Sequence, residues 1–82
     1  MVTPIQLDIL RRLYNDNKIG GSHTAIENLK KGVPSHMRGM VEKQAKELIK
    51  LGYILPKPTS YGLQVSLNPR MIPDIERLLG IS

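Results

Sequence analysis

Basic side chains, the residues of this sequence best suited to binding an anionic partner, are concentrated between residues 30 and 57. In that stretch seven basic side chains accompany two carboxylates, which leaves a net charge of +5, equal to the formal net charge of the whole chain. A localised basic region attracts phosphate backbones and other anionic surfaces, whereas a merely solvated helix face is the simpler alternative. The seven basic residues are Lys30, Lys31, Arg38, Lys43, Lys46, Lys50 and Lys57.

Patterns typical of catalysis or metal binding do not occur in the sequence. It contains no cysteine, no glycine loop that would cradle phosphate, no H-E-x-x-H motif and no carboxylate pair at a useful spacing. The two histidines, His23 and His36, lack the cysteine or paired acidic neighbours that define a metal site. We therefore expect a protein that is not an enzyme and that uses no cofactor and no metal.

The length of 82 residues is typical of one domain, and we expect a single domain over residues 1–82. With 40% hydrophobic residues but no Phe, Trp or Cys, its core must be built from aliphatic side chains, methionine and three tyrosines. No apolar run approaches 18 residues, and the N-terminal residues do not resemble a secretory signal. We expect no membrane span and a cytoplasmic location.

The element that must position the basic residues is a long helix predicted over residues 35–52. At about 100° per residue, one face of this helix is apolar and the opposite face is cationic. Ser35 is the expected N-cap, and Gly52 is expected to end the helix in the left-handed conformation. The apolar face holds Met37, Val41, Ala45 and Leu48, and the cationic face holds Gly39, Lys43, Lys46 and Lys50.

A first helix is predicted from Thr3 to about Asn15, because Thr3 and Gln6 have the spacing of a capping box and Pro4 suits the first helical position. Its apolar surface is broad enough to meet more than one partner. That surface holds Ile5, Ile9, Leu10, Leu13 and Tyr14.

A short second helix is predicted from the capping-box spacing of Thr24 and Glu27, with Ser22 as the alternative cap. Gly32 is placed to close it. Pro34 cannot continue that helix but can begin the next one, so the two helices should cross at a large angle as a helix-turn-helix.

Residues 53–67 are predicted to form a β-hairpin, in which Leu63, Val65 and Leu67 share one buried face. Pro56 and Pro58 lack an N–H, so the first strand should be an edge strand.

A last helix should follow Asn68 and Pro69 and end at Gly80. Pro73 leaves two alternatives: a short turn before a helix that starts at Pro73, or a kinked helix.

This order of elements resembles the winged helix-turn-helix family, and is similar to its small stand-alone archaeal members. The resemblance covers about residues 3–79 and rests on the stretches HTAIENLKKG, VPSHMRGMVEKQAKELIKLGY and YILPKPTSYGLQVSLNP. It implies an α+β, mainly helical fold with a three-helix core, a β-hairpin wing and a C-terminal helix.

In terms of function, the resemblance implies duplex DNA binding and transcription regulation, with the helix at about 35–51 in the major groove and the wing on the adjacent backbone or minor groove. Base contacts are expected from the first half of the helix, and phosphate contacts from the other candidates. The candidate DNA-binding residues are Ser22, His23, Thr24, Lys30, Lys31, Ser35, His36, Arg38, Gly39, Met40, Lys43, Lys46, Lys50, Lys57 and Tyr61.

Several of these residues have a structural alternative. Gly39 would serve equally for close packing against the second helix. Tyr61 shares the parity of the buried strand residues and would then pack over the sheet edge, and Arg38 lies only about 60° from the centre of the apolar face. The caps Ser22 and Thr24 and the lysine pair at positions 30 and 31 would serve only the second helix.

A second function class is a protein-interaction module that docks through the first and last helices. The same surface would make a homodimer, which would let a DNA-binding protein span two half-sites. RNA binding is a third alternative with less support, since the sequence lacks the usual aromatic stacking platform.

Overall fold

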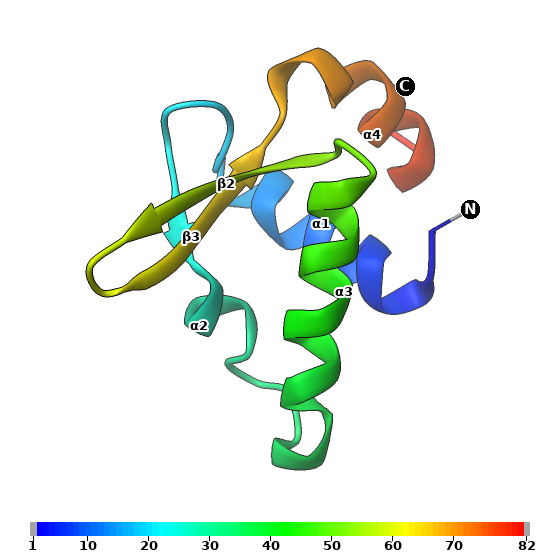
Figure 1. Cartoon of the computed structure of the whole chain (residues 1–82). Coiled ribbons are helices and arrows are strands. Elements are labelled where there is room, and N and C mark those ends of the chain that lie inside the picture. Colours follow the sequence, from blue (N-terminus) through cyan, green and yellow to red (C-terminus); the bar gives the residue numbers. More distant parts are fainter. Residues whose placement is uncertain (1, 82) are drawn as a thin grey trace.

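The protein is an α+β fold, about half helical, and the computed structural model describes residues 2–81 (Figure 1). The helices surround a three-stranded antiparallel sheet in the strand order β1-β3-β2. This arrangement is compatible with a winged helix. In chain order the elements are α1 (Pro4–Asn15), β1 (Thr24–Ala25), α2 (Ile26–Leu29), the 3-10 helix η1 (Ser35–Met37), α3 (Arg38–Lys50), β2 (Ile54–Thr59), β3 (Gly62–Leu67), the 3-10 helix η2 (Pro69–Met71) and α4 (Ile72–Leu79).

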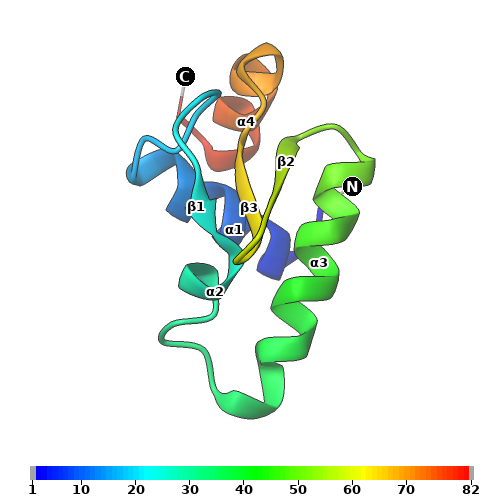
Figure 2. The same cartoon turned by 60° about the vertical axis from the view of Figure 1, so that its left-hand side comes forward.

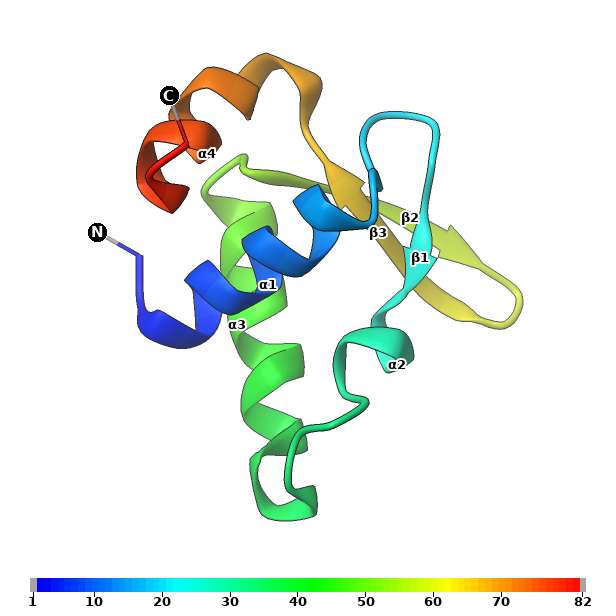
Figure 3. The same cartoon turned by 180° about the vertical axis from the view of Figure 1, so that it is seen from behind.

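One aliphatic core joins the helices to the sheet, as the composition predicts. α1 packs on α3 and β3, on the side turned away from the viewer in Figure 1 and seen from behind in Figure 3. Tyr14 and Tyr53 are only partly buried, at the margin of this core. The buried apolar residues are Ile9, Leu10, Leu13, Ile26, Leu29, Val41, Ala45, Leu48, Ile54, Val65, Leu67 and Ile75.

The predicted β-hairpin is confirmed as β2 and β3, which pair from Ile54 with Leu67 to Thr59 with Gly62. β2 is an edge strand, which explains why its two prolines are tolerated. Val65 and Leu67 are fully buried and Leu63 is half-buried, as the alternation predicts. The fully buried Ser66 is satisfied because its hydroxyl donates to the Gly20 carbonyl at 2.8 Å.

The N-terminus of α1 follows the prediction. The amide of Gln6 donates to the Thr3 hydroxyl at 3.1 Å, and the Thr3 amide donates to the Gln6 side-chain oxygen at 2.9 Å. The burial of the Gln6 side chain was not predicted from the sequence. Its Nε2 donates to Gln44 Oε1 at 2.7 Å, so the same glutamine that caps α1 also ties α1 to α3.

The predicted start of the second helix is wrong. Thr24 and Ala25 form β1 and pair with Val65 and Gln64 of β3. Ala25 occupies the N-cap position of α2, which has no side-chain capping bond. The hydroxyl of Thr24 instead accepts a hydrogen bond from the Asn28 side chain at 2.9 Å. The central strand β3 offers unpaired backbone groups on its free side, and satisfying them with Thr24 and Ala25 leaves a helix of only one turn.

The predicted N-cap Ser35 is also wrong. Pro34, with φ −54° and ψ 143°, precedes η1, and Ser35 lies inside this 3-10 turn with no side-chain capping bond at its start. The amide of Met37 donates to the Pro34 carbonyl at 2.9 Å, and α3 proper begins at Arg38. The fixed φ of proline starts the turn, so a side-chain cap is not needed to begin it.

The end of α3 agrees with the prediction. Gly52 adopts φ +85°, in the left-handed region. Its amide donates to the Ile49 carbonyl at 3.1 Å, and the Tyr53 amide donates to the Leu48 carbonyl at 3.0 Å, which is the pair of bonds that defines a Schellman motif. This turn sends the chain directly from α3 into β2.

We expect Gly52→Ala to lower the free energy of unfolding by about 1–2 kcal/mol, because a Cβ disfavours the left-handed conformation. Nothing lies within 4 Å of an added Cβ, so backbone strain is the whole effect. Urea unfolding followed by circular dichroism measures the loss. The matched control is Gly21→Ala, where there is neither a positive φ nor a close neighbour. Equal stability of the two variants would contradict this reading of the helix end.

The alternatives raised by Pro73 are settled by η2. The 3-10 turn Pro69–Met71 comes first, and α4 then starts at Ile72 with Pro73 in its first turn, where a missing N–H costs nothing. Asn68 caps the turn as predicted, since its Oδ1 accepts from the Arg70 amide at 3.1 Å. Gly80 ends α4 with φ +76°.

A hydrogen bond between the Tyr14 hydroxyl and Glu76 Oε2, 2.6 Å long, joins α1 to α4. This bond, with smaller contributions from desolvation and from the charge of Glu76, raises the pKa of Tyr14 above its usual value. Since the neutral phenol is the form favoured by folding, its stabilising effect is complete below the unfolded pKa of about 10 and is lost as pH rises through the raised folded pKa.

The unfolding free energy should therefore fall more steeply above about pH 10 in the wild-type protein than in Tyr14→Phe. Chemical denaturation over a series of alkaline buffers tests this expectation. Tyr61→Phe is the control, because Tyr61 is exposed. If the unfolding free energies of the wild-type protein and Tyr14→Phe had the same pH dependence, the hydrogen bond from Tyr14 to Glu76 would not contribute to stability.

Candidate nucleic-acid interface

The long helix α3 has the two faces that the sequence predicts. Val41, Ala45 and Leu48 are buried against the rest of the protein, and Met37, just before the helix, is half-buried. Figure 2 shows α3 at the margin of the molecule, with one long side free of other helices and strands. The residue face opposite the buried one is exposed. Its exposed basic residues are Lys43, Lys46 and Lys50.

The lysines of this face form no ion pair with a carboxylate in the described part of the chain. Within residues 2–81, the ion pairs join Arg11 to Asp8, Arg77 to Asp74, and Lys30 to two glutamates. None of them involves a lysine of α3 or Lys57 of β2. The exposed face therefore presents its positive charge to solvent, where a polyanion can meet it.

Lys30 has a different environment from the other candidate lysines. Its side chain is only 17% exposed, and its Nζ lies 3.2 Å from Glu27 Oε1 and 3.7 Å from Glu42 Oε2. These two contacts connect α2 to α3 and balance the charge of Lys30 within the protein. Lys31, one residue further along the chain, is exposed and remains suited to a phosphate contact.

The N-terminal end of α3 brings several of the candidates together. Ser35 and His36 are exposed in η1, directly before the helix, and Met40 is 46% exposed on its flank. Arg38 is exposed too, but its Nε donates to the Val33 carbonyl at 3.3 Å, so it is partly held by the protein. The rest of its guanidinium is available to a partner.

Gly39 lies in the first turn of α3 and is exposed. No atom beyond its local backbone lies within 4 Å of the position that a Cβ would occupy. Packing against the second helix, the structural alternative for this glycine, is therefore ruled out. The fold gives no structural reason for a glycine at this position. Close approach of an external partner is therefore the alternative that is left.

We expect Gly39→Ala to stabilise the protein by up to about 1 kcal/mol, because alanine is the better helix former and meets no clash. If a duplex lies close to this backbone, the same methyl group should weaken DNA binding at least severalfold. Thermal unfolding and fluorescence anisotropy with a labelled duplex measure the two effects. A variant that is more stable and binds as well as wild type would remove Gly39 from the interface.

The premise of the predicted phosphate site at Ser22, His23 and Thr24 is not met. These residues precede α2 instead of forming its first turn, so its helical amides do not surround them. Ser22 is exposed, whereas His23 and Thr24 are half-buried. They lie toward the β1 edge of the sheet, with β3 between them and the hairpin strand β2.

The hairpin presents two of the candidates. Lys57 is exposed in the middle of β2, and Tyr61, 98% exposed, stands in the two-residue loop between β2 and β3. This exposure rules out packing of Tyr61 over the sheet edge. Thr59 holds the loop in shape, since its hydroxyl accepts from the Tyr61 amide at 3.2 Å and donates to the Gly62 carbonyl at 2.7 Å.

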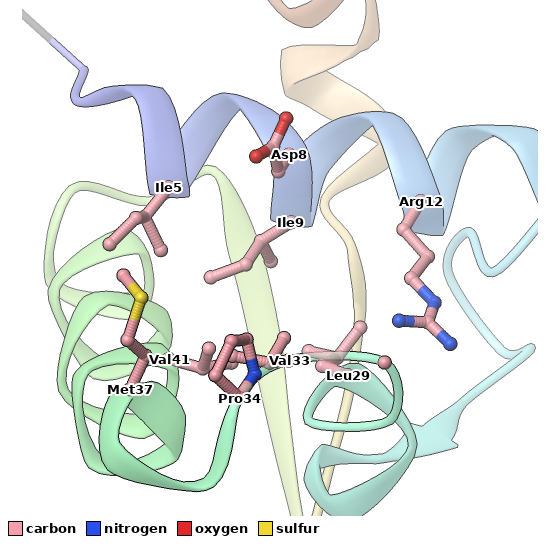
Figure 4. A pocket seen from close by; sticks show the side chains of 10 residues that line it. Ile5, Asp8, Ile9, Arg12, Leu29, Val33, Pro34, Met37 and Val41 are labelled. Atoms are coloured by element: carbon pink, nitrogen blue, oxygen red, sulfur yellow. The ribbon is translucent and has the colours of Figure 1, made fainter.

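A cavity of about 260 Å³ lies between α1 and the segment that connects α2 to α3, and it was not predicted from the sequence (Figure 4). The only sequence signal for it is the spacing of four α1 residues along one helix face, which by itself does not distinguish a cavity from a packed contact. Those residues are Ile5, Asp8, Ile9 and Arg12.

Comparisons of the chain with protein-family models, with curated proteins and with solved structures find no match. Over residues 2–81, no helix is both long and apolar enough to cross a membrane. In the same described part of the chain, no three side chains of the metal-binding types come together at one place.

Proposed function

We propose that this protein binds duplex DNA as a winged helix-turn-helix transcription regulator, with the exposed face of α3 in the major groove. The observation that carries this proposal is the row of exposed, unpaired lysines at positions 43, 46 and 50, opposite the buried face of the same helix. The order of helices and strands, which is compatible with a winged helix, supports it.

The dimensions of α3 suit this role. Its 13 residues give a helix about 20 Å long, and a B-DNA major groove about 12 Å wide admits a helix. In the proposed complex, His36, Arg38 and Lys43 lie near the base edges. Lys46 and Lys50, further along the helix, neutralise phosphates.

The hairpin and the turn after α2 supply further contacts besides those of α3. Lys57 and Lys31 supply exposed cations for phosphates. Tyr61 donates a hydrogen bond from its hydroxyl to a phosphate, or lays its ring against the sugar-phosphate backbone. Because phosphate contacts position the protein while base contacts select the sequence, the hairpin contributes chiefly to affinity.

A binding selection from randomised duplexes, with single-stranded RNA as competitor, tests the proposal. Enrichment of a duplex sequence that RNA does not displace is the expected result. Preferential recovery of RNA would instead favour the third function class, and recovery of neither nucleic acid would refute the proposal.

A homodimer remains a further proposal, and the surface open to it is narrower than the sequence suggests. Ile9, Leu10 and Leu13 of α1 are all buried in the core, so this face of the helix is not available for docking. Analytical ultracentrifugation with and without duplex separates a dimeric DNA-binding protein from a monomer that ignores DNA and docks a protein partner. The exposed large apolar side chains outside the hairpin loop are Met40, Leu51, Leu55, Leu78 and Ile81.

A further inference from the structure

The cavity of about 260 Å³ lies between α1 and the connection from α2 to α3 (Figure 4). Ile5 and Ile9 come from α1, Val33 and Pro34 come from the connection, and Met37 closes one side. Leu29 and Val41 complete the apolar wall. Small-molecule sites are typically concave and mostly apolar, with a few polar groups at defined places, and range upward from about 300 Å³. The cavity is likewise mostly apolar with a few polar groups, and its volume lies slightly below this range.

Its polar groups are Asp8 and Arg12, and they differ in orientation. In Figure 4 the Asp8 carboxylate points away from the apolar side chains, whereas the Arg12 side chain extends toward the connection that closes the cavity. Asp8 is paired with Arg11 at 3.3 Å. Arg12 therefore places a cationic group at the edge of the cavity, beside Leu29, whereas the Asp8 carboxylate is turned away from it.

Arg12 is held in place and retains binding capacity. Its Nη1 donates to the Lys31 carbonyl at 3.0 Å, which fixes the guanidinium between α1 and the connection. Within residues 2–81 it makes no ion pair. A guanidinium has five N–H donors, so a carboxylate can bind Arg12 while the bond to Lys31 remains.

We infer that this cavity binds a small monocarboxylate with a compact apolar body, its carboxylate on Arg12 and its body against Ile5, Ile9 and Val33. This site is separate from the DNA interface, and ligand binding to it does not depend on the proposed function. A neutral apolar group would gain binding free energy only from contacts with the apolar walls.

The position of the cavity allows a bound ligand to affect the proposed DNA interface. Arg12 bonds to the carbonyl of Lys31, a candidate phosphate contact, and Pro34 and Met37 lie at the start of the segment that leads into α3. An occupant that fills the space behind this segment restricts its movement. This consequence, a change in DNA affinity on ligand binding, rests on the proposed function.

The test uses sodium benzoate as the probe and benzamide as its neutral, similarly shaped control, followed by carbon-13 methyl NMR of the full chain. We expect benzoate to shift the methyl signals of Ile5, Ile9 and Val33 saturably, with a dissociation constant of about 1 mM for so small a ligand. Arg12→Gln should weaken this binding about five- to tenfold, because it removes a charge-assisted hydrogen bond at an exposed position.

Arg70→Gln is the matched control variant, since it removes the same charge at an exposed residue that does not line the cavity and is in none of the ion pairs described above, whereas Arg11 is paired with Asp8 at the cavity. It should leave benzoate affinity nearly unchanged, and well-dispersed spectra confirm that each variant is folded. Shifts that do not saturate, or an Arg12→Gln variant that binds as well as wild type, would overturn the inference. Equal binding of benzamide would also overturn it, and would point to an apolar side chain of a partner protein as the occupant.

A DNA readout separates the two proposals. If benzoate binds and also changes duplex affinity, both the site and its link to the interface hold. If benzoate binds the cavity of a protein that shows no duplex affinity, the proposed function fails while the carboxylate site stands. If the wild-type protein binds duplex but benzoate does not shift the methyl signals, only the proposal of the carboxylate site fails.

Discussion

Lys43→Glu is expected to weaken duplex binding by at least about tenfold at moderate salt, more than any other single charge substitution. Lys43 lies at the centre of the exposed face of α3, between Gly39 and the lysines at 46 and 50. The substitution removes one cation from the groove and places an anion there, so neighbouring phosphates are repelled as well as released. Fluorescence anisotropy with a labelled duplex measures the change.

The matched control is Arg70→Glu, which alters the net charge by the same two units at an exposed site in η2. A loss confined to Lys43→Glu shows that the local face of α3 matters, and equal losses would attribute binding to the overall charge of the protein. Lys43→Gln should give an intermediate affinity. Unchanged affinity in Lys43→Glu would contradict the assignment of α3 to the groove.

The largest expected effect on stability comes from Leu48→Ala. Leu48 is fully buried on the apolar face of α3, and its truncation should cost about 2–5 kcal/mol through lost burial and the cavity left behind. A chain of 82 residues has a total stability of about 4–12 kcal/mol, so this variant should be strongly destabilised or partly unfolded. Urea unfolding followed by circular dichroism measures the loss.

Leu51→Ala is the control, because it makes the same chemical change three residues away at a side chain that is 48% exposed. We expect a cost below about 1 kcal/mol there. Similar losses in both variants would mean that α3 is not anchored as described. DNA binding by Leu48→Ala should return when the temperature is lowered to restore the folded state, whereas Lys43→Glu should remain impaired.

Local patterns predicted much of this fold because they act over a few residues. The capping box at Thr3 and Gln6, the left-handed Gly52 and the alternation from Leu63 to Leu67 each depend on neighbours in the sequence. The two faces of α3 also follow from helical geometry alone. These are the features that place the lysines of α3 on the surface.

The failures of prediction arise from contacts between distant residues. Thr24 has the spacing of a helix cap, but pairing with β3, about forty residues further on, makes it part of a strand. Lys30 was among the cations expected to contact phosphate. Once α2 and α3 pack together, its Nζ lies 3.7 Å from Glu42 Oε2. The cavity beside Arg12 likewise exists only once α1 lies against the connection before α3.

Contacts between distant residues also hold α3 in place, as the proposed DNA contact requires. Gln6 bonds to Gln44 from α1, Lys30 bridges to Glu42 from α2, and the apolar face is buried in the core. These anchors leave the opposite face unobstructed. A helix fixed on its inner side can present its cations to a groove without losing further conformational entropy on binding.

The measurement that tests the central claim most directly is the salt dependence of duplex affinity for the wild-type protein. If the cations of α3, with Lys31 and Lys57, neutralise about five phosphates, the logarithm of the association constant should fall linearly with the logarithm of salt concentration, with a slope of about −4 to −6. An undetectable duplex affinity at low salt, or an affinity that does not change with salt, would contradict the assignment of α3 as a DNA-binding helix.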